Sequence, residues 1–162
     1  MIRHARIDEM GRLLEIYDTA RAFMRANGNA TQWGGGYPSR EILCEDIELG
    51  RLYVMEDGGE IYAAFVNIDG PDPTYAYIDG EWESDEDYGV IHRVASDGSH
   101  RGVFSEIVRF AEERYSHLRI DTHEDNIPMQ KAIEKEGFSH RGTIYLANGD
   151  PRRAYERVKS EK

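Results

Sequence analysis

A short polar loop with cationic neighbours is the first place where this chain could do chemistry. Between residues 92 and 102, two arginines and two histidines stand against one carboxylate: Arg93, Arg101, His92, His100 and Asp97. The loop leads into an apolar-periodic segment, and the first backbone N–H groups of a helix favour an anion. We therefore expect an anion to bind at this loop. Ordinary scaffold loops show the same features, and the sequence matches neither a P-loop nor a dinucleotide-binding fingerprint.

A second unusual segment is the loop at residues 27–38, which reads NGNATQWGGGYP. Its glycines and amide side chains predict an irregular backbone. It nevertheless carries Gln32, Trp33 and Tyr37. Large aromatic side chains on a glycine-rich loop favour a role in covering a pocket, although each ring alone is more typical of packing.

The charge balance argues against nucleic acid as a partner. Lys and Arg together number 20 and Asp and Glu 31, which gives a net charge of −11. Binding to phosphate backbones needs clustered cations, and this composition does not supply them. The acidic run from Glu81 to Asp87 is typical of a solvated turn, and beside a cleft it would attract cations.

Length and composition predict one folded domain spanning residues 1–162. A chain of 162 residues with 40% apolar side chains can bury a sizeable core and is too short for two ordinary domains. The one cysteine, Cys44, has no disulfide partner, and the opening residues resemble no secretory signal, so we expect a cytoplasmic location. Apolar runs such as Tyr62 to Val66 are too short to span a membrane.

Apolar spacing and capping residues predict four helices. They run from Asp8, as the cap, to about Ala26; from Ser39, as the cap, to Gly50, with Ile42, Leu43 and Ile47 buried; from Phe104 to Tyr115; and from Asn126, as the cap, to Glu136. Branched and aromatic runs predict the strands. These are a short opening strand, Leu52–Met55, Ile61–Val66, Tyr88–Ala95, Leu118–Thr122, Phe138–Leu146 and Arg152–Val158.

This order of elements predicts an α+β fold. We expect a mixed, mostly antiparallel sheet flanked by helices, with a central strand-loop-helix-strand unit and a C-terminal hairpin. A parallel pair of strands should form on either side of the helix in the central unit.

The central unit also carries an extended residue pattern. The segment VASDGSHRGVF is followed by a helix, then by LRIDTHEDNIPMQKAIEKEGF and the terminal hairpin. Val94, Gly102, Asn126, Gly137 and Phe138 stand in register with a known family pattern, and the element order matches over nearly the whole chain. The chain thus resembles the GNAT N-acetyltransferase superfamily. The resemblance implies a GNAT-like fold and acetyl-CoA as the acyl donor.

The resemblance implies which residues would contact acetyl-CoA. Backbone N–H groups around Arg93, Val94 and Ala95 would meet the thioester carbonyl, and Asn126 would hold the pantetheine arm. The pyrophosphate is assigned to the loop and the helix start, namely Ser99, His100, Arg101, Gly102, Val103 and Phe104. Two of these depart from the family pattern, since Ser99 stands at a Gln or Arg position and Phe104 at a Gly or Ala position.

The proton donor usual in the family, a Tyr in the last helix, is replaced here by Ile133. Tyr88 matches a position where some relatives carry a base. Asp121 and His123, two residues apart, should share one face of the neighbouring strand and could form a polar relay, and Tyr145 is a further candidate for the donor. Each of these residues also has a structural explanation, as strand filler or as a group at a strand end.

The resemblance further implies a pocket for an acceptor amine. We assign five side chains to its walls: Gln32, Trp33, Tyr37, Tyr75 and Trp82. No metal is expected, because the nearby His92, His123, Glu124 and Asp125 match no closed zinc pattern.

We therefore expect acetyl transfer from acetyl-CoA to a primary amine of a small molecule or peptide, by direct attack of the amine. The alternative is a non-catalytic CoA-binding or regulatory module, which Ile133 and Phe104 favour. A third possibility is a GNAT-like fold that has lost CoA and serves as an interaction domain. Exposed sheet edges favour a homodimer.

Overall fold

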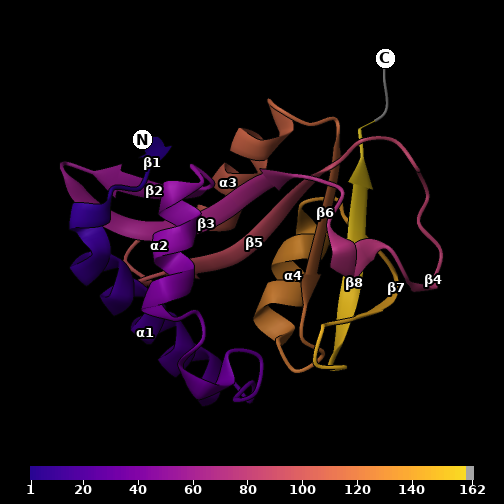
Figure 1. The fold of residues 1–162 in the computed structure, drawn as a ribbon, viewed down its shortest axis with the longest axis horizontal. Helices are drawn as coiled ribbons and strands as arrows, with labels where there is room; N and C mark the ends of the chain where they lie inside the picture. The colour runs from indigo at the N-terminus through magenta and orange to yellow at the C-terminus, as the bar shows by residue number, and fades with distance from the viewer. Residues whose placement is uncertain (160–162) are drawn as a thin grey trace. The chain divides into compact units, whose positions relative to one another are not determined.

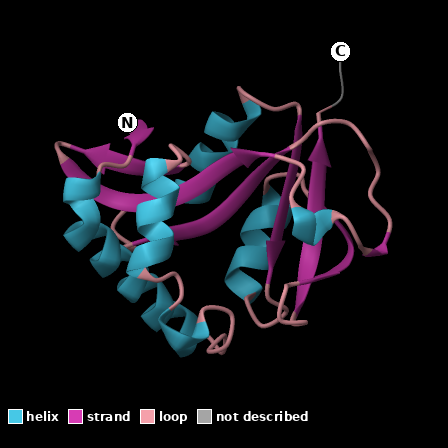
Figure 2. Ribbon diagram, in the orientation of Figure 1, coloured by secondary structure: helices cyan, strands magenta, loops and turns pink. Residues whose placement is uncertain are grey.

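A computed structural model of the chain describes residues 1–159, which form two compact units. Unit 1 comprises Met1–Asn67 and His92–Val103, and unit 2 comprises Ile68–Ile91 and the described residues from Phe104 onward. Each unit combines helices with strands (Figure 2). The prediction of a single domain stays a prediction.

Unit 1 contains the N-terminal helices and strands, indigo to magenta in Figure 1. Its elements are β1 (Ile2–His4), α1 (Met10–Ala26), α2 (Arg40–Glu48), β2 (Leu52–Asp57), most of β3 (Glu60–Asp69) and the second half of β5 (Gly89–Ser96). The strand order is β1-β2-β3-β5, and β2 forms antiparallel pairs with β1 and β3. Short 3-10 turns lie at Ile7–Glu9 and Gly34–Gly36.

Unit 2 contains the C-terminal hairpin and the parallel pair. Its elements are β4 (Asp79–Gly80), the first half of β5, α3 (Val103–Glu112, from its second residue), β6 (His117–Thr122), α4 (Ile127–Lys135), β7 (Ser139–Tyr145) and β8 (Pro151–Val158). The strand order is β5-β6-β8-β7-β4. A 3-10 turn at Pro73–Tyr75 precedes β4.

The predicted α+β class with a mixed, mostly antiparallel sheet is confirmed. Gly89 and Val90 of β5 lie opposite Leu118 and Arg119 of β6 in a parallel register. The pairs β6–β8, β7–β8 and β4–β7 are antiparallel, and β7 and β8 form the predicted C-terminal hairpin. The parallel pair therefore lies on either side of α3 in the chain, as the sequence predicted.

The core of each unit follows from the apolar spacing. In unit 1, Leu13, Ile16 and Tyr17 on one stripe of α1 are fully buried, as is Leu43 of α2. In unit 2, the aromatic ring of Tyr75 packs in a cluster with Val90, Ile144 and Ala154. These contacts bury apolar side chains in both units, and that burial is the main favourable contribution to folding.

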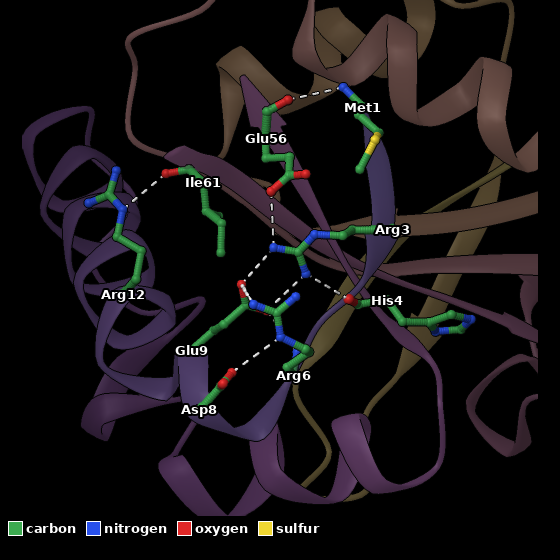
Figure 3. Close-up of polar contacts among 9 residues, drawn as sticks. All are labelled: Met1, Arg3, His4, Arg6, Asp8, Glu9, Arg12, Glu56 and Ile61. Carbon is green, nitrogen blue, oxygen red and sulfur yellow. Dashed lines mark hydrogen bonds and ion pairs between the residues drawn. The ribbon is translucent and has the colours of Figure 1, made fainter. Parts of the chain in front are cut away.

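The predicted cap of the first helix is wrong. Residues Ile7–Glu9 form a 3-10 turn, α1 begins at Met10, and Asp8 makes no cap. Instead, the Glu9 carboxylate accepts a hydrogen bond of 2.8 Å from the backbone N–H of Arg6 (Figure 3). The same Glu9 carboxylate is also bound by Arg3, at 3.0 and 2.6 Å.

The other two predicted caps are confirmed. The Ser39 hydroxyl accepts from the backbone N–H of Ile42 at 3.3 Å, and the Asn126 side chain accepts from Met129 at 3.2 Å. Both caps satisfy an N–H group that the first helical turn leaves without a partner.

Two strand positions and one helix face differ from the prediction. Tyr88 lies one residue before β5, and His123 lies one residue beyond the end of β6. In α2 the buried residues are Leu43 and Asp46, whereas Ile42 and Ile47 are half-buried. No helix of residues 1–159 is both long and apolar enough to cross a membrane.

Candidate active site

The backbone of β5 is irregular at Arg93. Arg93 has a φ of 49°, in the left-handed region, and no other non-glycine residue among residues 1–159 has a positive φ. This conformation costs a residue with a Cβ about 1–2 kcal/mol. The irregularity falls at residues 93–95, where the sequence predicted backbone donors for a thioester carbonyl.

The Arg93 side chain binds within unit 1 and does not extend into solvent as a free cation. Its guanidinium donates to the two Asp46 carboxylate oxygens at 2.8 and 2.7 Å and to the Tyr37 hydroxyl at 2.9 Å. Its carbonyl oxygen accepts from the Tyr17 hydroxyl at 2.6 Å. Burial lowers the pKa of Arg93, but the bonds to Asp46 and Tyr37 outweigh burial and raise it above its ordinary value.

The positive charge expected near the loop is therefore partly neutralised. The fully buried Asp46 carboxylate also binds Arg51 at 2.7 Å, and Arg51 in turn lies 3.9 Å from the exposed Glu45 carboxylate, so that the two guanidiniums face two carboxylates. The prediction that Arg93 contributes a free charge is thus corrected, because a buried carboxylate 47 residues away in the chain neutralises it.

The loop from Asp97 to Gly102 is shaped by the Asp97 carboxylate. One of its oxygens accepts from the backbone N–H of Ser99 at 2.9 Å and from the Ser99 hydroxyl at 2.6 Å. The other binds Arg12 at 2.7 Å, and Arg12 also donates to the Ile61 carbonyl (Figure 3). Burial raises the pKa of Asp97, but the bonds to Ser99 and Arg12 outweigh it and lower the pKa.

The rest of the loop offers one free cation and an open backbone. The imidazole of His100 stacks on Tyr62, with centroids 3.6 Å apart, and lies 3.2 Å from Asp57. Arg101 is exposed and has no ion-pair or hydrogen-bond partner among the described residues. Gly102 has a φ of 69°, and a Cβ built there would meet no atom within 4 Å. The backbone of the loop is thus open to a ligand.

Helix α3 begins at the half-buried Val103, directly after this loop. The ring of Phe104, the next residue, lies 6.5 Å from the buried Phe138 ring, centroid to centroid, and packs within unit 2. The bulky side chain at the family's small position is therefore directed into packing.

Unit 2 brings four of the predicted site residues together. The Tyr75 hydroxyl donates to the Asp121 carboxylate at 2.7 Å, and Trp82 donates to the Tyr75 carbonyl at 3.2 Å. The ring of Tyr88 lies 6.2 Å from that of Tyr75, and its hydroxyl accepts from the backbone N–H of Asp72 at 2.8 Å. Burial, followed by the Asp121 charge, raises the pKa of Tyr75. Tyr75 is only 2% exposed, so its ring belongs to the core.

The remaining predicted residues of unit 2 lie in two other places. His123 and Asn126 form one turn, in which the Asn126 backbone donates to the His123 carbonyl at 3.0 Å and Asp125 donates to the His123 imidazole at 2.9 Å. Tyr145 is 44% exposed on β7, and its ring lies 6.3 Å from that of Tyr77. Ile133 is fully buried in α4.

The glycine-rich loop of unit 1 places its aromatic rings near Arg93. The Trp33 ring lies 5.6 Å from Tyr17 and 6.3 Å from Tyr37. Gln32 accepts from Asn29 at 2.8 Å. Trp33 therefore packs against α1 and Tyr37 binds the Arg93 guanidinium, whereas Gln32 bonds within the loop itself.

Sequence reasoning missed the buried charges of both units. Asp46 is fully buried in unit 1, and Glu156 in unit 2 binds His117 at 2.6 Å with Arg119 and Arg141 nearby. This second cluster also holds the acidic run, because Glu156 accepts from the backbone of Glu83. Most of their partners lie far away in the chain: Arg93 is 47 residues from Asp46, and His117 and Glu83 are 39 and 73 residues from Glu156.

Metal ligation finds no support in the described chain. No group of three or more His, Cys, Asp or Glu side chains in residues 1–159 could hold a metal ion.

Solved structures with a similar fold cover nearly the whole chain. A GNAT-family acetyltransferase from Streptococcus agalactiae 2603 is 28% identical, with a TM-score of 0.90, and the match covers 99% of this chain and 96% of that one. A GNAT-family acetyltransferase from Listeria monocytogenes 4b F2365 is 19% identical, with a TM-score of 0.70 and coverage of 97% and 93%. A ribosomal-protein-alanine N-acetyltransferase from Brucella melitensis is 17% identical, with a TM-score of 0.62 and coverage of 98% and 99%.

No protein-family model matches the sequence, and no curated protein matches it. The similarity therefore comes from the fold, which these structures share from one end of the chain to the other. By its fold, this chain is similar over its full length to the GNAT-family acetyltransferases.

Proposed function

We propose that this chain is an N-acetyltransferase that moves an acetyl group from acetyl-CoA to a primary amine of a small molecule or peptide. The observation that carries the proposal is the segment from Arg93 to Val103. It joins a left-handed residue in β5 to an open loop that leads directly into α3. Strand irregularity, loop and helix start follow each other in the order that the resemblance predicts for acyl donor binding.

The loop fits a phosphate-bearing group. A Cβ added at Gly98 or Gly102 meets nothing within 4 Å, so the backbone can approach a ligand closely there. Arg101 supplies the free cation, and the first N–H groups of α3 add a partial positive charge. Ser99 plays a smaller part, because its backbone N–H is already bound by Asp97. Acetyl-CoA would supply the acetyl thioester at this site.

The chemistry requires two proton movements. The attacking amine must lose a proton as the C–N bond forms, and the thiolate released when the C–S bond breaks gains a proton. Backbone N–H groups at residues 93–95 would stabilise the charge that develops on the carbonyl oxygen. Tyr88, Asp121, His123 and Tyr145 stay the candidates for the proton transfers.

The binding test uses two glycine variants that carry the same strain and charge. Gly102→Glu and Gly149→Glu each place a carboxylate at an open, positive-φ position, the first in the loop and the second in the β7–β8 turn. We expect calorimetry to show acetyl-CoA binding to the parent and to Gly149→Glu, and none to Gly102→Glu. A parent that binds no acetyl-CoA would remove the acetyltransferase proposal.

A turnover test addresses the alternative of a non-catalytic CoA-binding module. That alternative has a specific observation in its favour, because the position of the usual donor is the fully buried Ile133. Release of free thiol from acetyl-CoA with a panel of primary amines separates the two. In an active protein, we expect Tyr88→Phe or His123→Ala to lower turnover more than acetyl-CoA affinity. A cytoplasmic location and a homodimer stay predictions from the sequence.

A further inference from the structure

Three side chains of unit 1 converge on one residue of β5. Asp46 and Tyr37 bind the guanidinium of Arg93, and Tyr17 binds its carbonyl oxygen. A left-handed conformation in a residue with a Cβ persists only where its surroundings hold it there. These three contacts therefore hold the backbone of Arg93 in its left-handed conformation.

We propose that Tyr17 and Asp46 are positioning residues that hold the peptide group after Arg93 and thereby aim the backbone N–H of Val94 at the thioester carbonyl. The inference rests on the proposed acetyl transfer, and it assigns roles to two residues that the sequence did not single out.

The rigidity of the peptide group gives Tyr17 its role. The carbonyl oxygen of Arg93 and the N–H of Val94 belong to one planar unit and point in opposite directions. Because the Tyr17 hydroxyl holds that oxygen at 2.6 Å, it also sets the direction of the Val94 N–H. Tyr17 is fully buried in α1, and burial raises its pKa, so its hydroxyl stays a donor.

Asp46 holds the same residue through its side chain. Its two carboxylate oxygens take two bonds from the flat guanidinium of Arg93, an arrangement that fixes orientation as well as distance. The carboxylate is itself held by Arg51 at 2.7 Å. With the side chain and the carbonyl both bound, the backbone at residue 93 has little freedom to relax into the extended conformation of its neighbours.

The test compares two buried tyrosine hydroxyls. Tyr17→Phe removes the hydroxyl that holds Arg93 and leaves the ring. Tyr155→Phe, the control, removes a hydroxyl from an equally buried tyrosine of unit 2 that accepts from Arg153 at 3.0 Å. We expect Tyr17→Phe to lower kcat by about tenfold to a hundredfold, since misaimed catalytic groups cost that much, with the KM for acetyl-CoA unchanged. Tyr155→Phe should leave kcat at the parent value.

A second measurement does not depend on activity. With 15N-labelled valine, we expect the Val94 amide resonance to move in Tyr17→Phe, whereas that of Val90, four residues earlier in β5, stays in place. Asp46→Asn should have the same effect on Val94. If Asp46→Asn does not fold, because it removes the carboxylate shared by the half-buried Arg93 and Arg51, Tyr17→Phe decides alone.

The outcomes separate the two proposals. An unchanged kcat together with an unchanged Val94 resonance in Tyr17→Phe would overturn the positioning role. An equal loss of kcat in Tyr155→Phe would also overturn it, because the effect would then be one of general stability. A parent that transfers acetyl to no amine, in which Val94 still moves, would refute the proposed function and retain the role of Tyr17 in holding the strand.

Discussion

At the scale of single residues, Arg101 is the free cation of the loop. If this residue meets a phosphate of acetyl-CoA, Arg101→Ala removes one exposed charge pair and should raise the dissociation constant by about twofold to fivefold. The effect should shrink as salt is added. Calorimetry at two salt concentrations measures the change in the dissociation constant and its dependence on salt. The control is Arg109→Ala, an exposed arginine later in α3. An equal effect of the two variants would mean that only the overall charge matters.

The Arg3–Glu9 pair predicts an acid-sensitive step in stability. Arg3 donates to both Glu9 oxygens, at 3.0 and 2.6 Å, and to Glu56 at 3.0 Å (Figure 3). The bond to Arg3 lowers the pKa of Glu9, although burial opposes it. A lowered pKa stabilises the fold above the ordinary pKa of the carboxyl group, and this contribution is lost as the pH falls through the folded value.

Glu9→Gln should therefore lower the free energy of unfolding at pH 7 by about 1–3 kcal/mol. The difference between the variant and the parent should shrink as the pH falls below the ordinary pKa of a Glu carboxyl, about 4.3, and should vanish only once the pH is below the lowered folded pKa and the parent carboxylate is protonated. Urea unfolding of the variant and the parent between pH 3 and 8 measures the loss of unfolding free energy at neutral pH and its decrease in acid. Glu15→Gln is the matched control, since Glu15 is 70% exposed in its pair with Arg12. A difference between Glu9→Gln and the parent that does not depend on pH would contradict this account.

The positions of some single residues could be predicted from the sequence, and the long-range contacts of others could not. The sequence placed Arg93 at a functional strand, and the structure finds its left-handed backbone there. It could not place Asp46, because a carboxylate in a helix normally faces water and its burial depends on Arg93, 47 residues away, as well as on the nearby Arg51. The pairing of Tyr75 with Asp121 was not foreseen either, because the two residues are 46 positions apart.

At the scale of elements, two glycines allow β4 to approach β7. Gly80 and Gly142 lie opposite each other, with φ of 138° and 155°. A Cβ on Gly142 would collide with the backbone of Asp79, and one on Gly80 with that of Arg141. Gly142→Ala should therefore destabilise unit 2 by about 2–3 kcal/mol, through backbone strain and the collision together.

The control for this prediction is a glycine that has a positive φ but no atom close to its Cβ position. Gly149 has a φ of 91° and open space around its Cβ position, so Gly149→Ala should cost only about 1 kcal/mol. Urea unfolding of both variants measures the difference. Equal losses would mean that the close approach of β4 and β7 contributes nothing.

The elements themselves were largely predictable, because their signals are local. The apolar spacing of α1 and α3 and the caps at Ser39 and Asn126 lie within a few residues of the turns that they define. The start of α1 was misplaced because a 3-10 turn at Ile7–Glu9 precedes it, and Glu9, not Asp8, accepts from the Arg6 N–H. The contact between β4 and β7 depends on residues about 60 positions apart, which local patterns do not record.

At the scale of the whole molecule, the prediction of one domain can be tested directly. The chain has two tryptophans, and they fall in different units, Trp33 in unit 1 and Trp82 in unit 2. Trp82→Phe leaves a fluorescent reporter in unit 1 alone, and Trp33→Phe leaves one in unit 2 alone. Phenylalanine preserves an aromatic ring at each position, which limits the loss of packing.

A single cooperative domain predicts that both reporters give the same unfolding midpoint and the same denaturant dependence as circular dichroism of the same variant. Strand β5 favours this outcome, because it supplies its first half to unit 2 and its second half to unit 1 and cannot unfold in one without disturbing the other. Separate midpoints for Trp33 and Trp82, each displaced from the circular dichroism curve, would show that the units unfold independently. Acetyl-CoA at 100 times its dissociation constant should then raise a single shared midpoint, by a free energy of about 2.7 kcal/mol, if one cooperative domain binds it.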